Sequence, residues 1–390
     1  MIHNPFRFGD PVSGQYYLDI PALGATVRQF LQNQIHVVLI GPRRFGKTSF
    51  IQNLLAGLEA DGWTTLFFDI YNVTSHRDFL QQLLRVMKSK QTWSRKAKDW
   101  GGSMAKLRPK LNVDVDALSG DLNVSLAPEL AATDIKEAIQ DAIASIASLG
   151  KKVVVAIDEF QTIAELQDNG WLEATLRTKM QSMPNVAFAF SGSRRRLIHE
   201  MINDVKRPFF RSCQPIDFPA FGPEFSTWVV GRLQTVGITC ATETVDLLRK
   251  LVHNTPNYVQ MAGFHLVASG VEHVTEKTVR QVLRTIVKQN AYAYQTILNS
   301  LTPVQQRALR LVAIEGEDLY SKANLTRYEI GSGPALASAL KALKAKQILE
   351  EGVAKGRVYF DDPLFAIWLK AEFSDFENDD ATEFDNSRLE

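Results

Sequence analysis

One short stretch of this chain constrains its fold more than any other. The apolar run Ile35–Ile40 leads into a loop with two glycines, and a helix-forming segment follows from Ser49 to Glu59. The loop fits the pattern G-x-x-x-x-G-K-[ST] and reads Gly41-Pro42-Arg43-Arg44-Phe45-Gly46-Lys47-Thr48. Strand, glycine loop and helix in this order form a cradle for the phosphates of a nucleotide.

Each residue type that this pattern specifies has a physical role. We expect Gly41 and Gly46 to let the backbone bend, so that consecutive N–H groups point at an anion. Lys47 is expected to reach the β- and γ-phosphates of ATP, and the Thr48 hydroxyl to bind Mg²⁺. Nucleotide contacts are therefore predicted for the loop and the first helical residues, namely Gly41, Pro42, Arg43, Arg44, Phe45, Gly46, Lys47, Thr48 and Ser49.

Composition describes an ordinary globular protein and excludes several classes. Of the 390 residues, 45% are hydrophobic and 22% charged, which is enough for two or three domains with real cores. The net charge of +1 provides no overall field for nucleic acid, so any such contact needs a local patch. Cys213 and Cys240 form neither a metal-ligand spacing nor a disulfide framework. With no signal-peptide pattern at Met1–Pro5 and no membrane-spanning apolar run, we expect a cytoplasmic protein.

The alternation of apolar runs and helical stretches predicts an α/β fold with a mainly parallel, covered sheet. The expected strands are His36–Ile40, Thr64–Tyr71, Lys152–Ile157, Val186–Phe190 and Gln214–Phe218. One interruption occurs after the second strand. There, alternating residues on both sides of Ser119-Gly120-Asp121 predict an inserted β-hairpin within about residues 105–128.

The segment before that hairpin, Lys88–Lys110, is rich in Lys and Arg and contains Trp93 and Trp100. Such a run has two interpretations, a nucleic-acid surface or a solvated helix face. The second is favoured, because charged runs usually face water.

The C-terminal half has a different pattern. Residues 222–300 are helical and interrupted at His253–Asn257, which we interpret as a lid domain. Helices are expected at Val304–Ala313, Ser321–Arg327 and Ala335–Lys346, followed by two strands flanking Gly352–Gly356. This is the order of a winged helix. The predicted domains are a P-loop ATPase core at 1–221, a lid at 222–300, a winged helix at 301–372 and an acidic disordered tail at 373–390.

Two carboxylates complete the expected nucleotide site. The buried strand Val153–Ile157 ends in Asp158 and Glu159, where strand ends of open α/β sheets meet their ligands. Asp158 is expected to hold Mg²⁺ directly or through water, and Glu159 to orient and deprotonate the attacking water.

Polar and basic residues follow the next strand. If that strand neighbours the first one, Ser193 lies beside the γ-phosphate, and Arg194 can sense this group by its fork of donors. Arg195 and Arg196 are as consistent with a basic helix start as with a role in the site. Arg207 and Arg211 can act as an arginine finger toward a neighbouring subunit or be structural.

Taken together, these motifs resemble the AAA+ ATPases, and within them the archaeal-type ATPase family of the STAND NTPases, in the MNS-like clade. The resemblance spans roughly residues 4–370 and rests on the phosphate loop, on Ile157–Gln161 and on Ser191–Arg194. It implies that Arg194 is the sensor of the γ-phosphate. It also implies that Pro256 packs on adenine, although Asn254 replaces the glycine of the family's Gly-x-Pro motif.

The two ends of the matched region differ in how well they fit the family. Tyr17–Ile20 lacks the arginine that the family carries before its first helix, so the resemblance gives no adenine contact there. The C-terminal stretch Asp362–Leu369 is similar to the family's Asp-Pro-x-Phe-x-x-Trp-Leu ending.

Two functions are compatible with these features. The first is an ATP-hydrolysing switch that couples its nucleotide state to lid, winged helix and a protein partner or self-association. The second is an ATP-controlled DNA-binding protein, supported by Lys341, Lys344, Lys346, Lys355 and Arg357. The Ala- and Leu-rich helix Ala335–Ala345 offers few side chains that read bases. A small-molecule kinase fits poorly, because it leaves Asp158-Glu159, the lid and the winged helix without a role.

Overall fold

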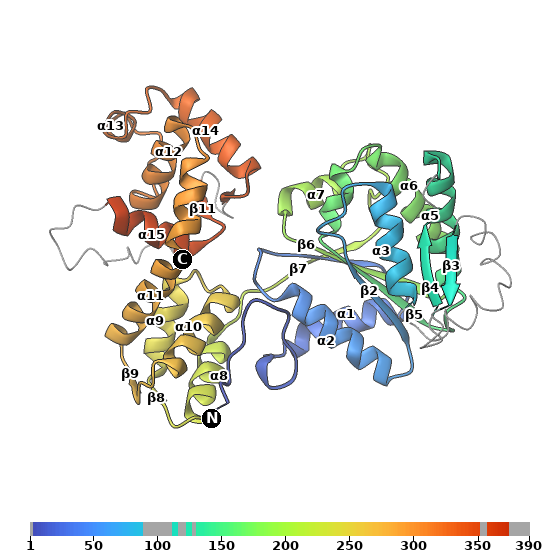
Figure 1. The fold of residues 1–390 in the computed structure, drawn as a ribbon, viewed down its shortest axis with the longest axis horizontal. Coiled ribbons are helices and arrows are strands. Elements are labelled where there is room, and N and C mark those ends of the chain that lie inside the picture. The colour runs from blue at the N-terminus through green and yellow to red at the C-terminus, as the bar shows by residue number, and fades with distance from the viewer. Residues whose placement is uncertain (1–2, 89–110, 116–121, 127–129, 352–356, 374–390) are drawn as a thin grey trace. The chain divides into compact units, whose positions relative to one another are not determined.

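The computed structural model describes residues 3–88, 111–115, 122–126, 130–351 and 357–373 (Figure 1). They form two compact units. One comprises Pro11–Pro219, and the other combines Met1–Asp10 with Ala220–Glu390. The first ten residues thus belong to the same unit as the C-terminal half.

A five-stranded parallel sheet forms the centre of the first unit, as predicted. Its strand order is β2-β5-β6-β1-β7, and every neighbouring pair is parallel. The strands are β1 (Val37–Ile40), β2 (Thr64–Asp69), β5 (Val153–Asp158), β6 (Val186–Gly192) and β7 (Gln214–Asp217). Because β6 lies between β1 and β5, the residues after these three strands share one edge of the sheet.

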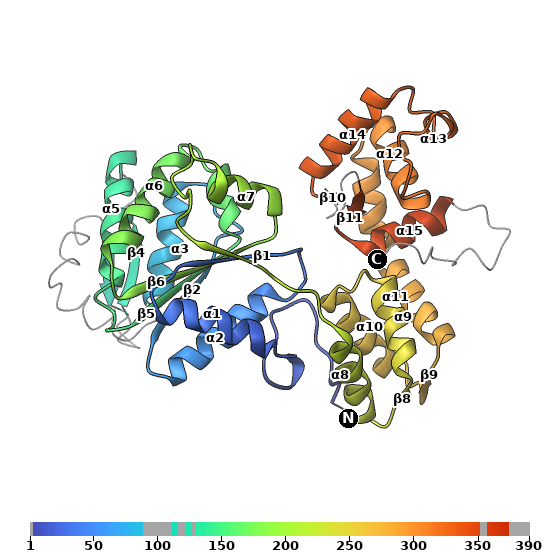
Figure 2. The ribbon, with the colours of Figure 1, turned by 180° about the vertical axis from the view of Figure 1, so that it is seen from behind.

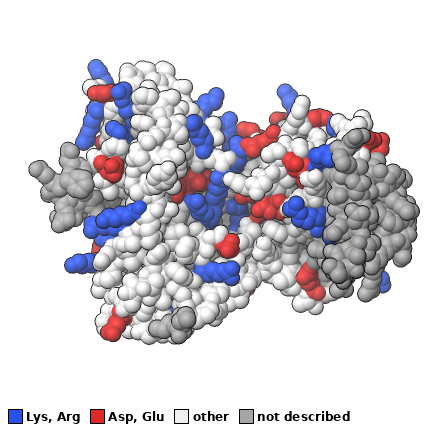
Figure 3. Space-filling model, viewed as in Figure 1, with Lys and Arg blue, Asp and Glu red and all other residues white. Residues whose placement is uncertain are grey.

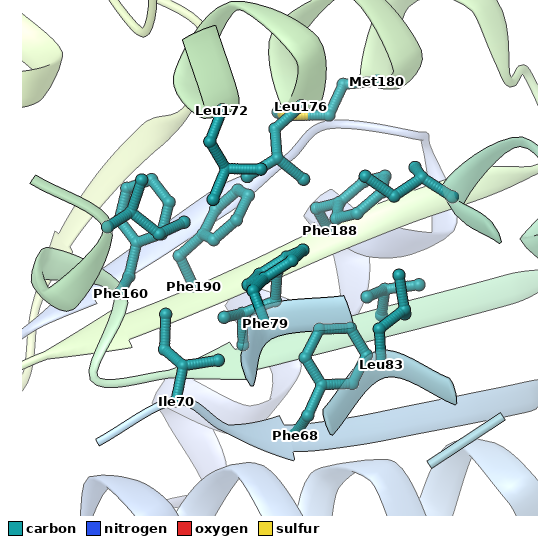
Figure 4. Close-up of a cluster of buried hydrophobic side chains, with 14 of the residues drawn as sticks. Phe68, Ile70, Phe79, Leu83, Phe160, Leu172, Leu176, Met180, Phe188 and Phe190 are labelled. Atoms are coloured by element: carbon teal, nitrogen blue, oxygen red, sulfur yellow. The ribbon is translucent and has the colours of Figure 1, made fainter. Parts of the chain in front are cut away.

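Helices cover both faces of this sheet (Figures 1 and 2). On one face lie α1 (Pro21–Gln32) and α2 (Lys47–Ala60), and on the other lie α3 (His76–Lys88), α5 (Ala132–Ile146), α6 (Asn169–Ser182) and α7 (Arg195–Asn203). Successive strand residues alternate between two cores: Val38 and Ile40 join one, Val37 and Leu39 the other. Figure 4 shows the first core, where Phe188 and Phe190 of β6 meet Phe79 and Leu83 of α3. This two-sided burial explains why the strands read as continuous apolar runs.

The predicted inserted hairpin is present in the first unit. Its strands β3 (Leu111–Val115) and β4 (Leu122–Leu126) pair antiparallel, with Leu111 opposite Leu126. The loop of the hairpin and residues 89–110 of the basic run lie outside the described residues.

The region predicted as a lid consists of α8 (Pro223–Gln234), α9 (Thr242–Leu251), α10 (Pro256–Ala268) and α11 (Glu276–Asn299). It also contains a two-residue parallel ladder between β8 (Thr239–Cys240) and β9 (His273–Val274), which the helical sequence pattern did not predict. The N-terminal segment packs along α10. The Asn4 side-chain amide donates to the Phe264 carbonyl at 3.0 Å, and the buried Phe6 ring fills the space left by Gly263.

The winged helix follows the predicted order. It comprises α12 (Pro303–Ile314), α13 (Lys322–Arg327), α14 (Gly333–Ala345), β10 (Leu349–Glu351), β11 (Val358–Phe360) and α15 (Pro363–Phe373). Thr302 and Gln305 cap α12 reciprocally, side chain to backbone N–H in both directions. Acidic groups lie among the basic ones on this domain (Figure 3). The wing loop at 352–356 and the tail at 374–390 lie outside the described residues. Within the described ranges, no helix has the length and apolar character to cross a membrane.

Candidate nucleotide site

The phosphate loop connects β1 to α2. Gly46 has φ 94° and Arg44 has φ 61°, so the backbone turns through left-handed conformations directly before the helix begins at Lys47. Gly41 is required for another reason. A Cβ at this position would lie 2.8 Å from the Cβ of Phe218, a residue hydrogen-bonded through its N–H to the carbonyl of Ile40. Close packing against the segment after β7, rather than a left-handed bend, therefore calls for Gly41.

Lys47 is buried and lies against its own loop. Its ammonium donates to the carbonyl of Gly41 at 2.9 Å and to that of Pro42 at 2.7 Å. These bonds hold a positive charge beside the left-handed turn, as phosphate binding requires. The hydroxyl of Ser49, for which we predict a nucleotide contact, accepts the backbone N–H of Val12 at 3.0 Å.

Thr48 and Asp158 come together at the predicted metal position. The Thr48 hydroxyl donates to Asp158 Oδ2 at 2.5 Å. The other carboxylate oxygen, Oδ1, accepts the hydroxyl of the fully buried Ser191 and the backbone N–H of Glu159. Asp158 is therefore fixed from three directions at the end of β5.

Glu159 follows in a left-handed conformation, with φ 55°. Its Oε2 accepts the side-chain amide of Gln161, and the Ser193 hydroxyl at 3.2 Å. Ser193 in turn accepts Arg43 Nε of the phosphate loop at 3.4 Å. Hydrogen bonds thus connect the phosphate loop, the residue that follows β6 and the carboxylate of Glu159. The sequence did not single out Gln161, because an amide two positions after an acidic pair carries no pattern of its own.

A third carboxylate lies on the same edge. Asp69 ends β2 and pairs in register with Asp158. Burial raises the pKa of Asp69, and the charges of Asp158 and Glu159 add to this against a hydrogen bond from the backbone of Tyr71. The shift comes mainly from burial, and the two neighbouring carboxylates contribute less to it.

The arginines of the region are engaged within the protein. Arg194 donates to Glu165, Arg195 lies 3.5 Å from Asp217, and Arg196 pairs with Glu200 one turn along α7. Arg207 donates to the buried Glu173 at 2.5 Å. Arg211 is exposed and stacks over the Phe210 ring at 5.1 Å. Arg194 must leave Glu165 if it is to reach a phosphate.

In the second unit, Pro256 is the first residue of α10. Asn254 stands before it with φ 53°, and its amide donates to the carbonyl of Phe221 at 2.9 Å while its Oδ1 accepts Arg249 Nε at 2.9 Å. Asparagine tolerates the left-handed conformation better than most residues. This explains how Asn254 can stand where the related motif has glycine.

The residues present fit Mg²⁺. The ion prefers a few oxygen ligands and keeps several waters, and the bonded oxygens of Thr48 and Asp158 supply such a pair. The described residues contain no cluster of three or more His, Cys, Asp or Glu side chains able to hold a metal by themselves. The remaining ligands of an ion here would be phosphate oxygens and water.

Comparison with known proteins agrees with this geometry. Residues 28–199 match the family model described as an AAA domain, and residues 292–371 match one described as a probable winged helix domain. The chain combines an AAA domain with a winged helix domain. No curated protein matches it in sequence.

Solved structures share the fold of these domains over nearly the whole chain. The Walker-type ATPase of Pyrococcus abyssi has a TM-score of 0.62 at 17% identity, covering 91% of this chain and 96% of its own. The Aeropyrum pernix ORC2 protein, solved in ADPNP–ADP complexes, has a TM-score of 0.52 at 13% identity, covering 90% and 93%. The ORC1 protein of the same organism, solved in complex with DNA, has a TM-score of 0.50 at 13% identity, covering 92% and 94%.

Proposed function

We propose that this protein is an Mg²⁺-dependent ATPase of the switch type, in which the nucleotide state controls the lid, the winged helix and the binding of a partner. The observation that carries the proposal is the Thr48–Asp158 hydrogen bond beside Glu159. It joins the phosphate loop to the acidic strand end in the arrangement that hydrolysis needs. The proposal includes a place among the STAND NTPases and a cytoplasmic location.

Each side chain has a task in this scheme. Lys47 exchanges a loop carbonyl for phosphate oxygen and so binds ATP. Mg²⁺ held by Thr48 and Asp158 would neutralise phosphate charge. Glu159 orients water and accepts its proton, and Arg194, once released from Glu165, senses the terminal phosphate. Pro256 packs on adenine, and the exposed Arg211 acts toward a second copy.

The chain itself provides a route from the nucleotide to the lid. The Gly9 N–H donates to Asn257 Oδ1 of α10 at 3.0 Å. Three residues later, the Val12 N–H donates to Ser49 Oγ, and its carbonyl accepts Asn53 of α2 at 2.9 Å. The short segment from Gly9 to Val12 is therefore hydrogen-bonded to α10 at one end and to α2 at the other, which supports coupling between them.

The test uses the Glu159→Gln variant of the full chain. The amide cannot accept the water's proton, so we expect hydrolysis to fall by about 100-fold to 10,000-fold while ATP stays bound. Phosphate release and retention of radiolabelled ATP on the filtered protein measure the two effects. Hydrolysis at the wild-type rate would contradict the role of Glu159.

A second function, ATP-controlled DNA binding, is suggested by the structural likeness to the ORC1 protein solved with DNA. Two of its supporting residues are engaged within the domain, since Lys344 pairs with Glu351 and Arg357 with Glu317. Lys355 and most of the Lys88–Lys110 run lie outside the described residues. Gel shifts across a salt series, with and without ATP, decide the question, because phosphate contacts weaken steeply with salt. If no gel shift is observed at low salt, binding of a protein partner remains as the proposed function.

A further inference from the structure

Gln161 is a buried polar residue that the proposed chemistry does not yet use. It lies in the 3₁₀ helix η4 (Phe160–Glu165), only 3% exposed, two residues after Glu159. Its amide nitrogen donates to Glu159 Oε2, whereas its carbonyl oxygen Oε1 is buried without a hydrogen-bond partner. A buried acceptor without a partner destabilises the fold, so the contact with Glu159 calls for a functional explanation.

The orientation of this amide is determined by the carboxylate. If the amide were flipped, Oε1 of Gln161 would face Oε2 of Glu159, and two acceptors would repel each other. The orientation with nitrogen toward Glu159 gives a charge-assisted hydrogen bond instead. Gln161 therefore acts on Glu159 as a donor.

The neighbouring strand leaves the space that Gln161 occupies. A Cβ at Gly192 of β6 would lie 2.0 Å from Gln161 Oε1 and 2.5 Å from Cδ1 of Ile198. The glycine has no left-handed φ that would require it. The Gln161 amide occupies the space that a side chain at Gly192 would fill, so strand β6 and the amide are packed against each other.

The hydrogen bonds to the Glu159 carboxylate converge on one oxygen. Both Gln161 Nε2 and Ser193 Oγ donate to Oε2, and Arg43 Nε donates to Ser193. Two donors on Oε2 fix the plane of the carboxylate and leave Oε1 as the oxygen to accept a proton.

We propose that Gln161, seated against Gly192, is a positioning residue that holds Glu159 Oε2 so that Oε1 faces the attacking water. This rests on the ATPase function proposed above. In the hydrolytic step the water proton passes to Oε1, the water oxygen bonds to the terminal phosphorus, and the bridging P–O bond breaks with its electron pair leaving on ADP. Gln161 touches none of the reacting atoms and acts through Glu159 alone.

The experiment measures steady-state ATP hydrolysis, ATP affinity and thermal stability of the full chain carrying Gln161→Leu. We expect kcat to fall by about 10-fold to 100-fold, with KM and the Kd for a fluorescent ATP analogue within about twofold of wild type. Leucine removes a buried acceptor that lacks a partner and also the hydrogen bond to Glu159, and these changes oppose each other, so Tm should change little. A purely structural role predicts the reverse, a lower Tm with normal kcat.

Two further variants test the arrangement around the amide. Thr162→Val removes a buried hydroxyl from the same 3₁₀ helix, one that makes none of the described bonds to Glu159, and should leave kcat unchanged. Gly192→Ala should lower kcat in the wild-type background, since its methyl group displaces the amide, and by a smaller factor in a Gln161→Ala background, where only the close contact with Ile198 remains.

The outcomes separate this inference from the function on which it rests. If the wild-type protein hydrolyses ATP and the Gln161→Leu variant has the same kcat, only the positioning role is overturned. A fall in kcat matched by Thr162→Val, or accompanied by loss of ATP affinity, also overturns it, because the amide would then serve the fold. Absence of hydrolysis in the wild type overturns both proposals.

Discussion

The nucleotide edge of the sheet and the winged helix hold their polar groups in different ways. Asp158, Gln161 and Ser193 are each at most 3% exposed and are joined by hydrogen bonds across three segments of the chain. In the winged helix the ion pairs lie at the surface, as between Arg357 and Glu317. Buried polar groups keep one geometry, because breaking a bond leaves a desolvated atom unpaired. Ion pairs at the surface contribute little to the free energy of unfolding, and their charged groups can contact water or a partner instead.

This difference has a functional meaning. Under the proposed function, chemistry on a phosphate would use the fixed donors and acceptors of the first unit. Recognition of a partner would use charges that can change partners, such as those at the surface of the winged helix. Four predictions test this contrast.

The largest effect is expected at the phosphate loop. Lys47→Ala removes the ammonium held by the Gly41 and Pro42 carbonyls, and we expect ATP affinity to fall by at least about 100-fold, because charge-assisted hydrogen bonds to phosphate are lost. Isothermal titration calorimetry measures the affinity. The matched change Lys341→Ala in the winged helix should leave it unaltered. An equal loss of ATP affinity in both variants would contradict the difference proposed between the nucleotide edge and the winged helix.

The second prediction concerns the buried ion pair of the first unit. Burial raises the pKa of Glu173 to about 7, although the Arg207 guanidinium opposes this shift. Between pH 4.5 and 7 the unfolded chain therefore ionises Glu173 while the folded protein retains the proton, so stability falls as pH rises. Glu173→Gln removes this loss and should gain up to about 3 kcal/mol over wild type across that window.

Urea denaturation at several pH values measures that difference. Glu200→Gln, which alters the exposed pair with Arg196, serves as the control and should show no such trend. A difference between Glu173→Gln and wild type that does not change with pH would mean that Glu173 stays ionised in the folded protein.

The third prediction concerns the lid. At φ 53°, Asn254→Ala keeps a β-carbon in the left-handed conformation but loses the bonds to Phe221 and Arg249. Asn254→Gly loses the same bonds without the steric cost. We expect the alanine variant to be less stable than the glycine variant by about 1 kcal/mol, measured by thermal unfolding. Equal stabilities would show that the backbone relaxes at this position.

The smallest effect is expected at the surface of the winged helix. Arg357→Ala breaks the pair with Glu317 and should change the free energy of unfolding by less than about 1 kcal/mol. The same variant measures the DNA-binding alternative, since loss of one phosphate contact lowers the salt slope of binding by about one. A large loss of stability would mean that this pair is structural.

The sequence by itself determined the architecture of the protein. Apolar runs predicted strands β1, β2, β5 and β6, because strands buried on both faces of a sheet need apolar residues at nearly every position. Edge strand β7 is Gln-Pro-Ile-Asp and largely exposed, and it was also predicted. The hairpin strands and the winged helix were also predicted from the sequence, the latter from three expected helices followed by two strands. These sequence patterns are local, because each depends on the periodicity of apolar residues or on a helix cap.

Only the tertiary structure decided how the site is held together. The sequence predicted Asp158 and Ser193 as site residues but gave Gln161 no role, and these residues meet because β5 and β6 are neighbours with their carboxyl ends on one edge. The need for Gly41 comes from Phe218, about 180 positions away, and that for Gly192 from Gln161. Such requirements depend on what packs against a residue, and a local pattern cannot contain them. The phosphate loop can thus be predicted from the sequence alone. The orientation of Glu159 beside it depends instead on the packing of three segments of the chain.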